Sequence, residues 1–218
     1  VFAGSHDVSV LLGQSYNVDK VDAVTMSSVG GFRGNAITTL SDANGVTGNT
    51  NEARNVLVSY FGRLQYSYRN KYMLTASMRR DGSSRFGSNT RWGLFPSASI
   101  GWRVSEEDFM KKVTAINDLK IRASWGKSGN YNIGNYSTIS TLGTFNYTFN
   151  GVAAIGQAPN SITNPDLAWE KSETFDVGFD VSVLKNRLSV SFDYYTRLST
   201  DLLLNVPILA ATGFTSYL

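Results

Sequence analysis

The sequence has 218 residues, of which 42% are hydrophobic and 17% are charged, so it is long enough to bury the core of one or two domains. It contains no cysteine, which excludes disulfides, thiolate zinc sites and a cysteine nucleophile. His6 is the only histidine and leaves no histidine-based metal cluster or serine triad, so we expect no cofactor, no metal and no enzymatic activity. The net charge of +3 is spread along the chain and indicates a mildly basic surface rather than nucleic-acid binding.

The start of the chain and its hydropathy restrict how it could meet a membrane. It begins at Val1 without the basic and apolar regions of a signal peptide, so we expect a mature or internal segment. No stretch reaches the roughly 18 apolar residues of a spanning helix, and the closest one, 206–211, contains Pro207. Contact with a membrane would therefore have to be made by strands.

Taken in chain order, seven segments alternate apolar and polar residues with the period of a strand. The composition agrees, because 20 glycines against 4 prolines and an aromatic content of 12% favour strands joined by glycine-containing turns. The predicted strands are residues 7–13, 58–68, 72–81, 92–104, 119–126, 169–183 and 188–198.

Each predicted strand has one apolar and one polar row. We expect Leu64, Ile100 and Val177 on one face and Arg63 on the other. The polar rows mix Arg, Asp, Ser, Thr and Gly, as the wall of a hydrated lumen does. The lumen-lining candidates are Arg63, Gln65, Arg79, Arg103, Lys120, Arg122, Asp176, Asp180, Asp193 and Arg197.

The connections alternate in length. Residues 69–71 and 185–187 are tight turns, whereas 14–55, 82–91 and 129–168 are longer, rich in Gly, Asn, Ser and Thr, and predicted to be loops at the opposite end. Segment 105–117 falls on the short side, where Ser105 and the acidic residues after it predict a capping box that opens a short helix.

These features favour a membrane barrel over a soluble sandwich, which alternates in the same way. The strands are long enough to cross an apolar band of about 25 Å at a tilt, and aromatic residues gather at the strand ends as two girdles. About seven strands would leave both sheet edges open, so we expect the chain to be part of a larger barrel. The predicted girdle residues are Tyr60, Trp92, Trp125 and Trp169 near the long loops, and Tyr66, Tyr68, Tyr72 and Trp102 near the short turns.

Three motifs have a functional and a structural interpretation. Segment 80–87 suits a ligand loop, but its Asp-Gly-Ser-Ser also suits a tight connection in which Arg and Asp pair locally. Residues 42–45 begin like a calcium loop but lack its later ligands, which indicates a turn. The aspartates 176, 180 and 193 could be catalytic carboxylates, although lumen-facing Asp beside Arg is the ordinary alternative.

The segment 129–168 is rich in aromatic and Asn residues. Such a surface suits stacking on sugars or peptides, and equally suits packing on neighbouring loops or on a second protein. Both interpretations stay open for Tyr131, Tyr136, Phe145, Tyr147 and Phe149.

Many ordered motifs of the chain resemble SusC/RagA-type TonB-linked outer-membrane proteins. The resemblance covers nearly the whole chain and is densest over residues 56–130 and 164–205. It lies in Ser59–Leu64, Tyr72–Ala76, Arg79–Gly87, Arg91–Gly93, Phe95–Ser97, Gly101–Arg103, Leu119–Gly126, Asn164–Glu170, Asn186–Leu188, Asp193–Tyr195 and Asp201–Leu204.

This resemblance implies an antiparallel transmembrane β-barrel of about 22 strands, of which the chain supplies one wall within a single barrel domain. It further implies a bacterial outer-membrane location, a plug domain that residues 1–218 lack, and partnership with TonB and a SusD-like surface lipoprotein. The implied activity is import of oligosaccharides or peptides. The alternative is a surface-exposed binding or adhesive β-protein without active transport.

Overall fold

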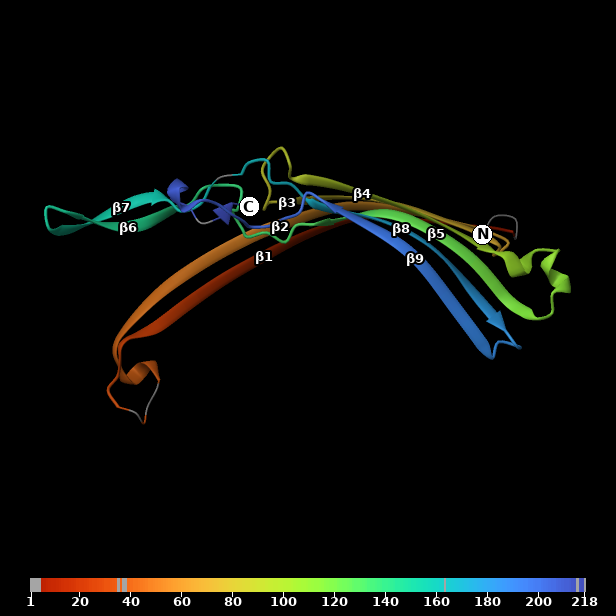
Figure 1. Cartoon of the computed structure of the whole chain (residues 1–218), viewed down its shortest axis with the longest axis horizontal. Helices are drawn as coiled ribbons and strands as arrows, with labels where there is room; N and C mark the ends of the chain where they lie inside the picture. The colour runs from red at the N-terminus through yellow and green to blue at the C-terminus, as the bar shows by residue number, and fades with distance from the viewer. Residues whose placement is uncertain (1–4, 35, 37–38, 163, 215, 218) are drawn as a thin grey trace.

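A computed structural model describes residues 5–34, 36, 39–162, 164–214 and 216–217. The chain forms a bowed antiparallel sheet of seven strands in the order β1-β2-β3-β4-β5-β8-β9, with one small hairpin inserted between β5 and β8 (Figure 1). The sheet strands are β1 (His6–Phe32), β2 (Ala43–Tyr68), β3 (Tyr72–Ser83), β4 (Trp92–Arg103), β5 (Ile116–Asn130), β8 (Glu170–Val183) and β9 (Leu188–Thr200).

The remaining elements are short. The inserted hairpin consists of β6 (Leu142–Phe149) and β7 (Val152–Pro159), and β10 (Val206–Pro207) pairs with β11 (Ser216–Tyr217). The 3-10 turns are η1 (Leu40–Asp42), η2 (Val104–Glu106), η3 (Met110–Lys112) and η4 (Ala210–Thr212). Within the described residues, no helix combines the length and the apolar character that crossing a membrane requires.

The seven predicted strands are all present, and each pairs antiparallel with its sheet neighbours. The turn at 69–71 is confirmed: Arg69 and Asn70 have φ of 51° and 55°, the left-handed pair that a tight hairpin needs. The turn between β8 and β9 occupies 184–187, where Leu184, Lys185 and Asn186 also have positive φ.

Because every strand reverses direction, the connections fall at two ends of the sheet. We call the end with 69–71, 104–115 and 184–187 the turn end, and the end with 33–42, 84–91 and 131–169 the loop end. The predicted separation of short and long connections is therefore confirmed (Figure 1).

The prediction of a loop over 14–55 was wrong. Strands β1 and β2 continue through most of it in unbroken register, from Gln14 opposite Tyr60 to Val29 opposite Gly45. This two-stranded ribbon is exposed on both faces, because even its apolar residues Val21, Val24 and Met26 are more than half exposed. A ribbon that buries neither face can be polar on both, which explains the composition of the segment. A strand that is polar on both faces does not alternate between apolar and polar residues, so its sequence cannot be distinguished from that of a loop.

Two further boundaries differ from the sequence prediction. The segment 129–168 contains the β6–β7 hairpin, and β5 extends into it as far as Asn130. Strand β3 continues beyond the predicted 72–81 to Ser83, so Gly82 lies inside the strand rather than in the predicted connection 82–91. Gly82 is there because a Cβ would meet the Trp92 ring at 2.8 Å, so the glycine makes room for an aromatic residue on the neighbouring strand.

The prediction of one capped short helix within the connection 105–117 was also wrong. The segment has two separate 3-10 turns, η2 and η3, and neither has a side-chain cap. The Ser105 hydroxyl does not cap a helix but donates to Asp118 Oδ1 at the start of β5 (2.7 Å), so the residue that resembled an N-cap makes a tertiary contact instead.

Candidate functional site

The register of the strands divides the side chains of the sheet into two faces. Arg63 pairs across the sheet with Ser77, Ser97, Gly126, Thr174 and Arg197 in one continuous row. The next rows on the same face contain the other lumen-lining candidates, so all ten lie on what we call the polar face. Leu64, Ile100 and Val177 lie together on the opposite, apolar face, as predicted.

An ionic cluster around Arg122 occupies the middle of the polar face. The Arg122 guanidinium lies 2.6 Å from Asp193 Oδ1, 3.1 Å from Asp180 Oδ2 and 4.0 Å from Asp176 Oδ1. The Ser191 hydroxyl also donates to Asp180 (2.8 Å). The three aspartates are thus the partners of one arginine on neighbouring strands, which supports the structural alternative to catalytic carboxylates.

Gly178 makes the central ion pair possible. In the register it stands between Arg122 on β5 and Asp193 on β9, and a Cβ there would meet the Phe192 carbonyl oxygen at 2.6 Å and the Asp193 carboxylate. Arg122 therefore reaches across a strand without a side chain in the way. This role could not be predicted from the sequence, because only the pairing register shows which residues Gly178 faces.

A second ionic group lies nearer the loop end of the polar face. The Arg79 guanidinium donates to Asp81 at 2.8 Å and to the Ser59 hydroxyl at 3.0 Å. Ser59 is fully buried and Asp81 nearly so. Local pairing of Arg and Asp in this motif was predicted, although the partner is Arg79 rather than Arg80, whose guanidinium lies over the Trp92 ring.

The polar face is hollowed toward the turn end. A shallow hollow of about 500 Å³ extends across side chains from β1 to β8, including Asp7, Gln65, Thr75, Lys120 and Asp176. Arg63, at the loop-end side of this region, is exposed and forms no ion pair with a described residue. The polar face thus presents positively charged donors and negatively charged acceptors of hydrogen bonds. Within the described residues, no group of His, Asp and Glu side chains is placed to hold a metal ion.

The predicted girdle residues on the apolar face form aromatic contacts near the two ends. Tyr60 stacks on Trp92 near the loop end, with ring centroids 6.2 Å apart, and Tyr68 stacks on Tyr72 at the turn end. The Trp125 indole donates to Glu173 (2.6 Å). Exposed aromatic rings with polar partners at both edges of an apolar band are the arrangement expected of residues at a membrane interface.

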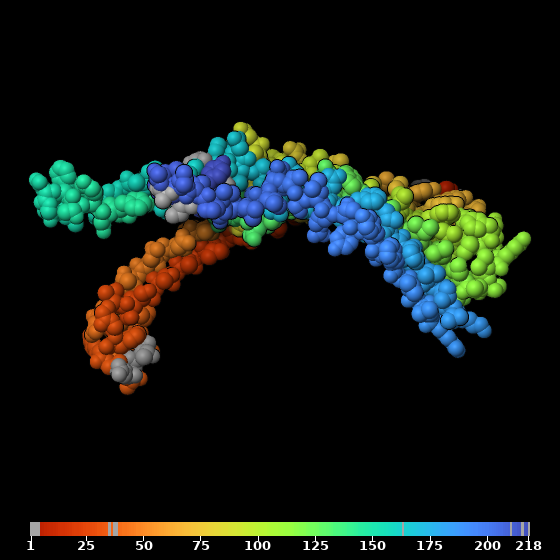
Figure 2. All heavy atoms as spheres, viewed as in Figure 1, coloured from red at the N-terminus to blue at the C-terminus, as the bar shows by residue number. Residues whose placement is uncertain are grey.

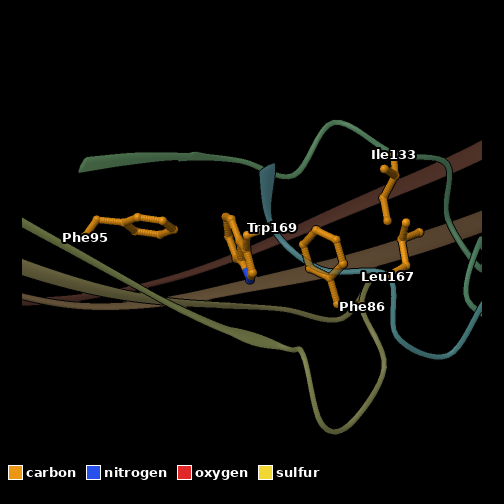
Figure 3. Packing of buried hydrophobic residues seen from close by; sticks show 5 residues of the cluster. All are labelled: Phe86, Phe95, Ile133, Leu167 and Trp169. Carbon is orange, nitrogen blue, oxygen red and sulfur yellow. The ribbon is translucent and has the colours of Figure 1, made fainter. Parts of the chain in front are cut away.

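Trp169 does not belong with these residues, and its prediction as a girdle residue was wrong. It lies just before β8, is 3% exposed, and donates its indole N–H to the Arg91 carbonyl (3.0 Å). It is the centre of the hydrophobic core, in which loop-end segments pack on one another (Figure 3). The members of this core are Phe86, Phe95, Ile133, Leu167 and Trp169.

The loop aromatics fall into two groups. Tyr131 is partly buried. Its ring centroid lies 5.5 Å from that of Trp169, and the guanidinium carbon of Arg85 lies 5.4 Å from the Tyr131 centroid, so Tyr131 joins two loop-end connections. Tyr136, Phe145, Tyr147 and Phe149 are exposed. The last three form one row on the β6–β7 hairpin, opposite Gly156, Ala154 and Val152.

At the turn end, Glu107 fixes the connection 104–115 to the apolar face. Its carboxylate accepts hydrogen bonds from the Tyr72 hydroxyl (2.6 Å), the Trp102 indole (3.1 Å) and the Lys71 ammonium (3.4 Å). Glu107 lies in the connection outside the strands. These donors, Tyr72 first, hold the pKa of the Glu107 carboxyl below its usual range.

The comparisons with known proteins agree with this geometry. Residues 2–217 match the family model described as TonB dependent receptor-like, beta-barrel. The chain is 45% identical over 170 residues to TonB-dependent receptor P39 of Formosa agariphila, covering 78% of the chain and 16% of that protein. It is 43% identical over 166 residues to TonB-dependent receptor SusC of Bacteroides thetaiotaomicron, covering 74% of the chain and 16% of that protein.

A solved structure of the RagAB peptide transporter superposes on 99% of the chain with a TM-score of 0.87 and 31% identity, and the match covers 24% of that structure's chain. The chain thus spans less than a quarter of the length of these relatives.

A seven-stranded antiparallel wall with a polar face, an apolar face and aromatic residues at both ends is a segment of an outer-membrane β-barrel. The chain belongs to the TonB-dependent receptor-like β-barrel family, among relatives of the SusC and RagA type.

Proposed function

We propose that this chain is the lumen wall of a TonB-dependent outer-membrane transporter that imports oligosaccharides or peptides together with a SusD-like lipoprotein. The observation that carries the proposal is the polar face, on which all ten candidate residues lie on one side of a sheet whose other side is apolar. Family membership supports the transport class, and the RagAB peptide transporter among the similar structures supports peptides as cargo, whereas oligosaccharides rest on the resemblance to SusC/RagA-type proteins.

In this proposal the polar face lines the lumen and the apolar face meets lipid. The loop end lies outside the cell, and the turn end faces the periplasm. Ion pairs such as Arg122–Asp193 satisfy charges within the wall, while Arg63 remains free to contact a plug domain or passing cargo. A wall of mixed charge with many hydroxyls hydrates a channel without selecting one sign of cargo.

The β6–β7 hairpin is the proposed contact for cargo or for the lipoprotein. Its aromatic row projects from a hairpin without any charged residue, and Tyr147 and Phe149 are about two-thirds exposed. Figure 2 shows the hairpin extending from the loop end, separate from the ribbon of β1 and β2. Aromatic faces stack on sugar rings and on peptide side chains, and they also anchor protein interfaces.

The test is uptake of labelled oligosaccharides and of labelled peptides by cells that express the full-length protein, with and without TonB and the lipoprotein. The proposal predicts that uptake of one cargo class depends on both. Surface binding that persists without TonB, with no uptake of either cargo, would contradict it and support the adhesive alternative.

Variants of the hairpin then assign the aromatic row. Phe145→Ala, Tyr147→Ala and Phe149→Ala together should lower either cargo affinity or lipoprotein co-purification. The matched control on the other face of the same strand is Thr144→Ala, Asn146→Ala and Thr148→Ala. Equal behaviour of the two triple variants would remove the row from the proposal.

A further inference from the structure

Several cations at the turn end form no ion pair within the part of the chain that the structure describes. Three cations there form ion pairs with carboxylates: Lys71 with Glu107, Arg103 with Asp118 and Lys111 with Asp108. Arg69, Lys112, Lys185 and Arg187 form no ion pair with a described residue. Of the acids in these connections only Glu106 is likewise without an ion pair, so the turn end carries an excess of exposed positive charge.

Exposed apolar side chains accompany these cations. Phe109 is 62% exposed, Val113 is 40% exposed, and Leu184, in the left-handed turn between β8 and β9, is 66% exposed. Soluble turns favour Asn, Asp and Gly, so a leucine and a phenylalanine presented beside lysines are not explained by turn geometry.

The two connections are parts of one surface. The backbone N–H groups of Lys185 and Asn186 both donate to the Asn117 side chain at the end of the 104–115 connection (2.8 and 3.3 Å). Both segments lie at the same end of the sheet in Figure 1. We call Lys112, Lys185, Arg187, Phe109, Val113 and Leu184 the basic rim.

Glu107 attaches the connection of the basic rim to the apolar face. It lies two residues before Phe109 and accepts hydrogen bonds from Tyr72 and Trp102, which both stand in apolar-face rows. Ser105, earlier in the same connection, donates to Asp118 in a polar-face row. The segment that begins at Phe109 therefore follows the point at which the connection is attached to the side of the sheet that we take as lipid-facing.

We propose that the basic rim binds the headgroups of anionic phospholipids at the turn end of the barrel. Phe109, Val113 and Leu184 would enter the boundary between headgroups and acyl chains, and Lys112, Lys185 and Arg187 would pair with phosphates. Cations near an anionic bilayer surface attract it, and apolar residues beside them increase the affinity. This inference rests on the proposed function only in taking the apolar face as the lipid-facing one.

The test uses the full-length protein purified in detergent and loaded with equal amounts of phosphatidylglycerol and phosphatidylcholine. Native mass spectrometry then gives the ratio of retained anionic to zwitterionic lipid. We expect a clear excess of phosphatidylglycerol that falls on the order of a hundredfold in the variant K112Q/K185Q/R187Q, because each of the three cations contributes about fivefold near an anionic surface. Higher salt should lower the same ratio.

The matched control is K20Q/R33Q/K171Q, which removes the same charges from exposed positions toward the loop end. Its lipid ratio should equal that of the unchanged protein. An equal fall in both triple variants, or no fall in the first, would overturn the proposal. The readout needs neither cargo nor TonB, so a protein that transports nothing can still pass or fail this test.

Discussion

The wall and the two arms of this molecule are built from the same antiparallel pairing but differ in what else holds them. The inner wall strands, β2 to β5 and β8, have neighbours on both sides, and the wall is joined further by Arg122, Arg79 and the core around Trp169. The distal β1–β2 ribbon and the β6–β7 hairpin have one partner strand each, and Val24 and Ile155 are 66% and 80% exposed. Backbone pairing thus suffices to extend an arm, whereas side-chain networks mark the part that must keep its shape.

The largest expected difference between these regions comes from removing an aromatic side chain in each. Trp169→Ala should lower the free energy of unfolding by about 3–5 kcal/mol, because it empties the centre of the only buried cluster in the described residues. Phe149→Ala on the exposed hairpin should change it by no more than about 0.5 kcal/mol. Denaturant titration of the full-length protein in detergent measures the loss of unfolding free energy in both variants. Similar losses would contradict the proposed difference between the wall and the hairpin.

The next test concerns glycine. Gly178→Ala should destabilise the wall by about 1–3 kcal/mol, because the new Cβ meets the Phe192 carbonyl and the Asp193 carboxylate. Gly34→Ala, beside the ribbon tip, meets nothing within 4 Å and is the control. The fraction of barrel that migrates as folded on unheated gels reports the loss. A neutral Gly178→Ala would show that Arg122 does not need the open path across β8.

The coupling energy of an ion pair should also be larger in the wall than in the β1–β2 ribbon. A double-mutant cycle of Arg122→Gln and Asp193→Asn should give a favourable coupling energy, since Arg122 is shared by three aspartates within the wall. The same cycle with Lys20→Gln and Glu52→Gln on the ribbon should give a coupling near zero, because both side chains are more than half exposed. Similar coupling energies in the two cycles would show that ion pairs do not hold the wall together more strongly than the ribbon.

The smallest effect is a pH dependence at the turn end. The pKa of Glu107 is lowered in the folded protein, so its contribution to stability is present above the unfolded pKa and is lost as pH falls through the folded one. Acidification should therefore release Trp102, and the fluorine resonance of 5-fluorotryptophan at this position should shift. In Glu107→Gln the resonance should stay constant with pH; an identical shift there would assign the effect to another group.

The sequence predicted the wall far better than the arms, for physical reasons. Alternation in which one row is apolar fixes both the strand and its face, as for Leu64 and Arg63. Where both rows are polar, as around Asn49 and Thr50, nothing separated a paired ribbon from a loop. The proposed cargo class and partners rest on the family resemblance, because no strand pattern contains them.

Contacts that depend on register could not be predicted. Trp169 has the spacing of a girdle residue, yet it is buried because the connections 84–91 and 131–169 pack around it together with Phe95 of β4. The partners of Arg122 and the role of Gly178 follow from which residues face each other on β5, β8 and β9. Ser105 resembles a helix cap but donates to Asp118, a choice set by the fold around it.

The central claim is that one face of this sheet meets lipid and the other lines a hydrated lumen. Spin labels on single cysteines at 64, 100 and 177, and at 63, 122 and 180, in an otherwise cysteine-free full-length protein in bilayers, test it most directly. Oxygen, which partitions into lipid, should broaden the spectra of the first set, and a water-soluble nickel complex should broaden those of the second. Equal accessibility of the two sets to the nickel complex would contradict it.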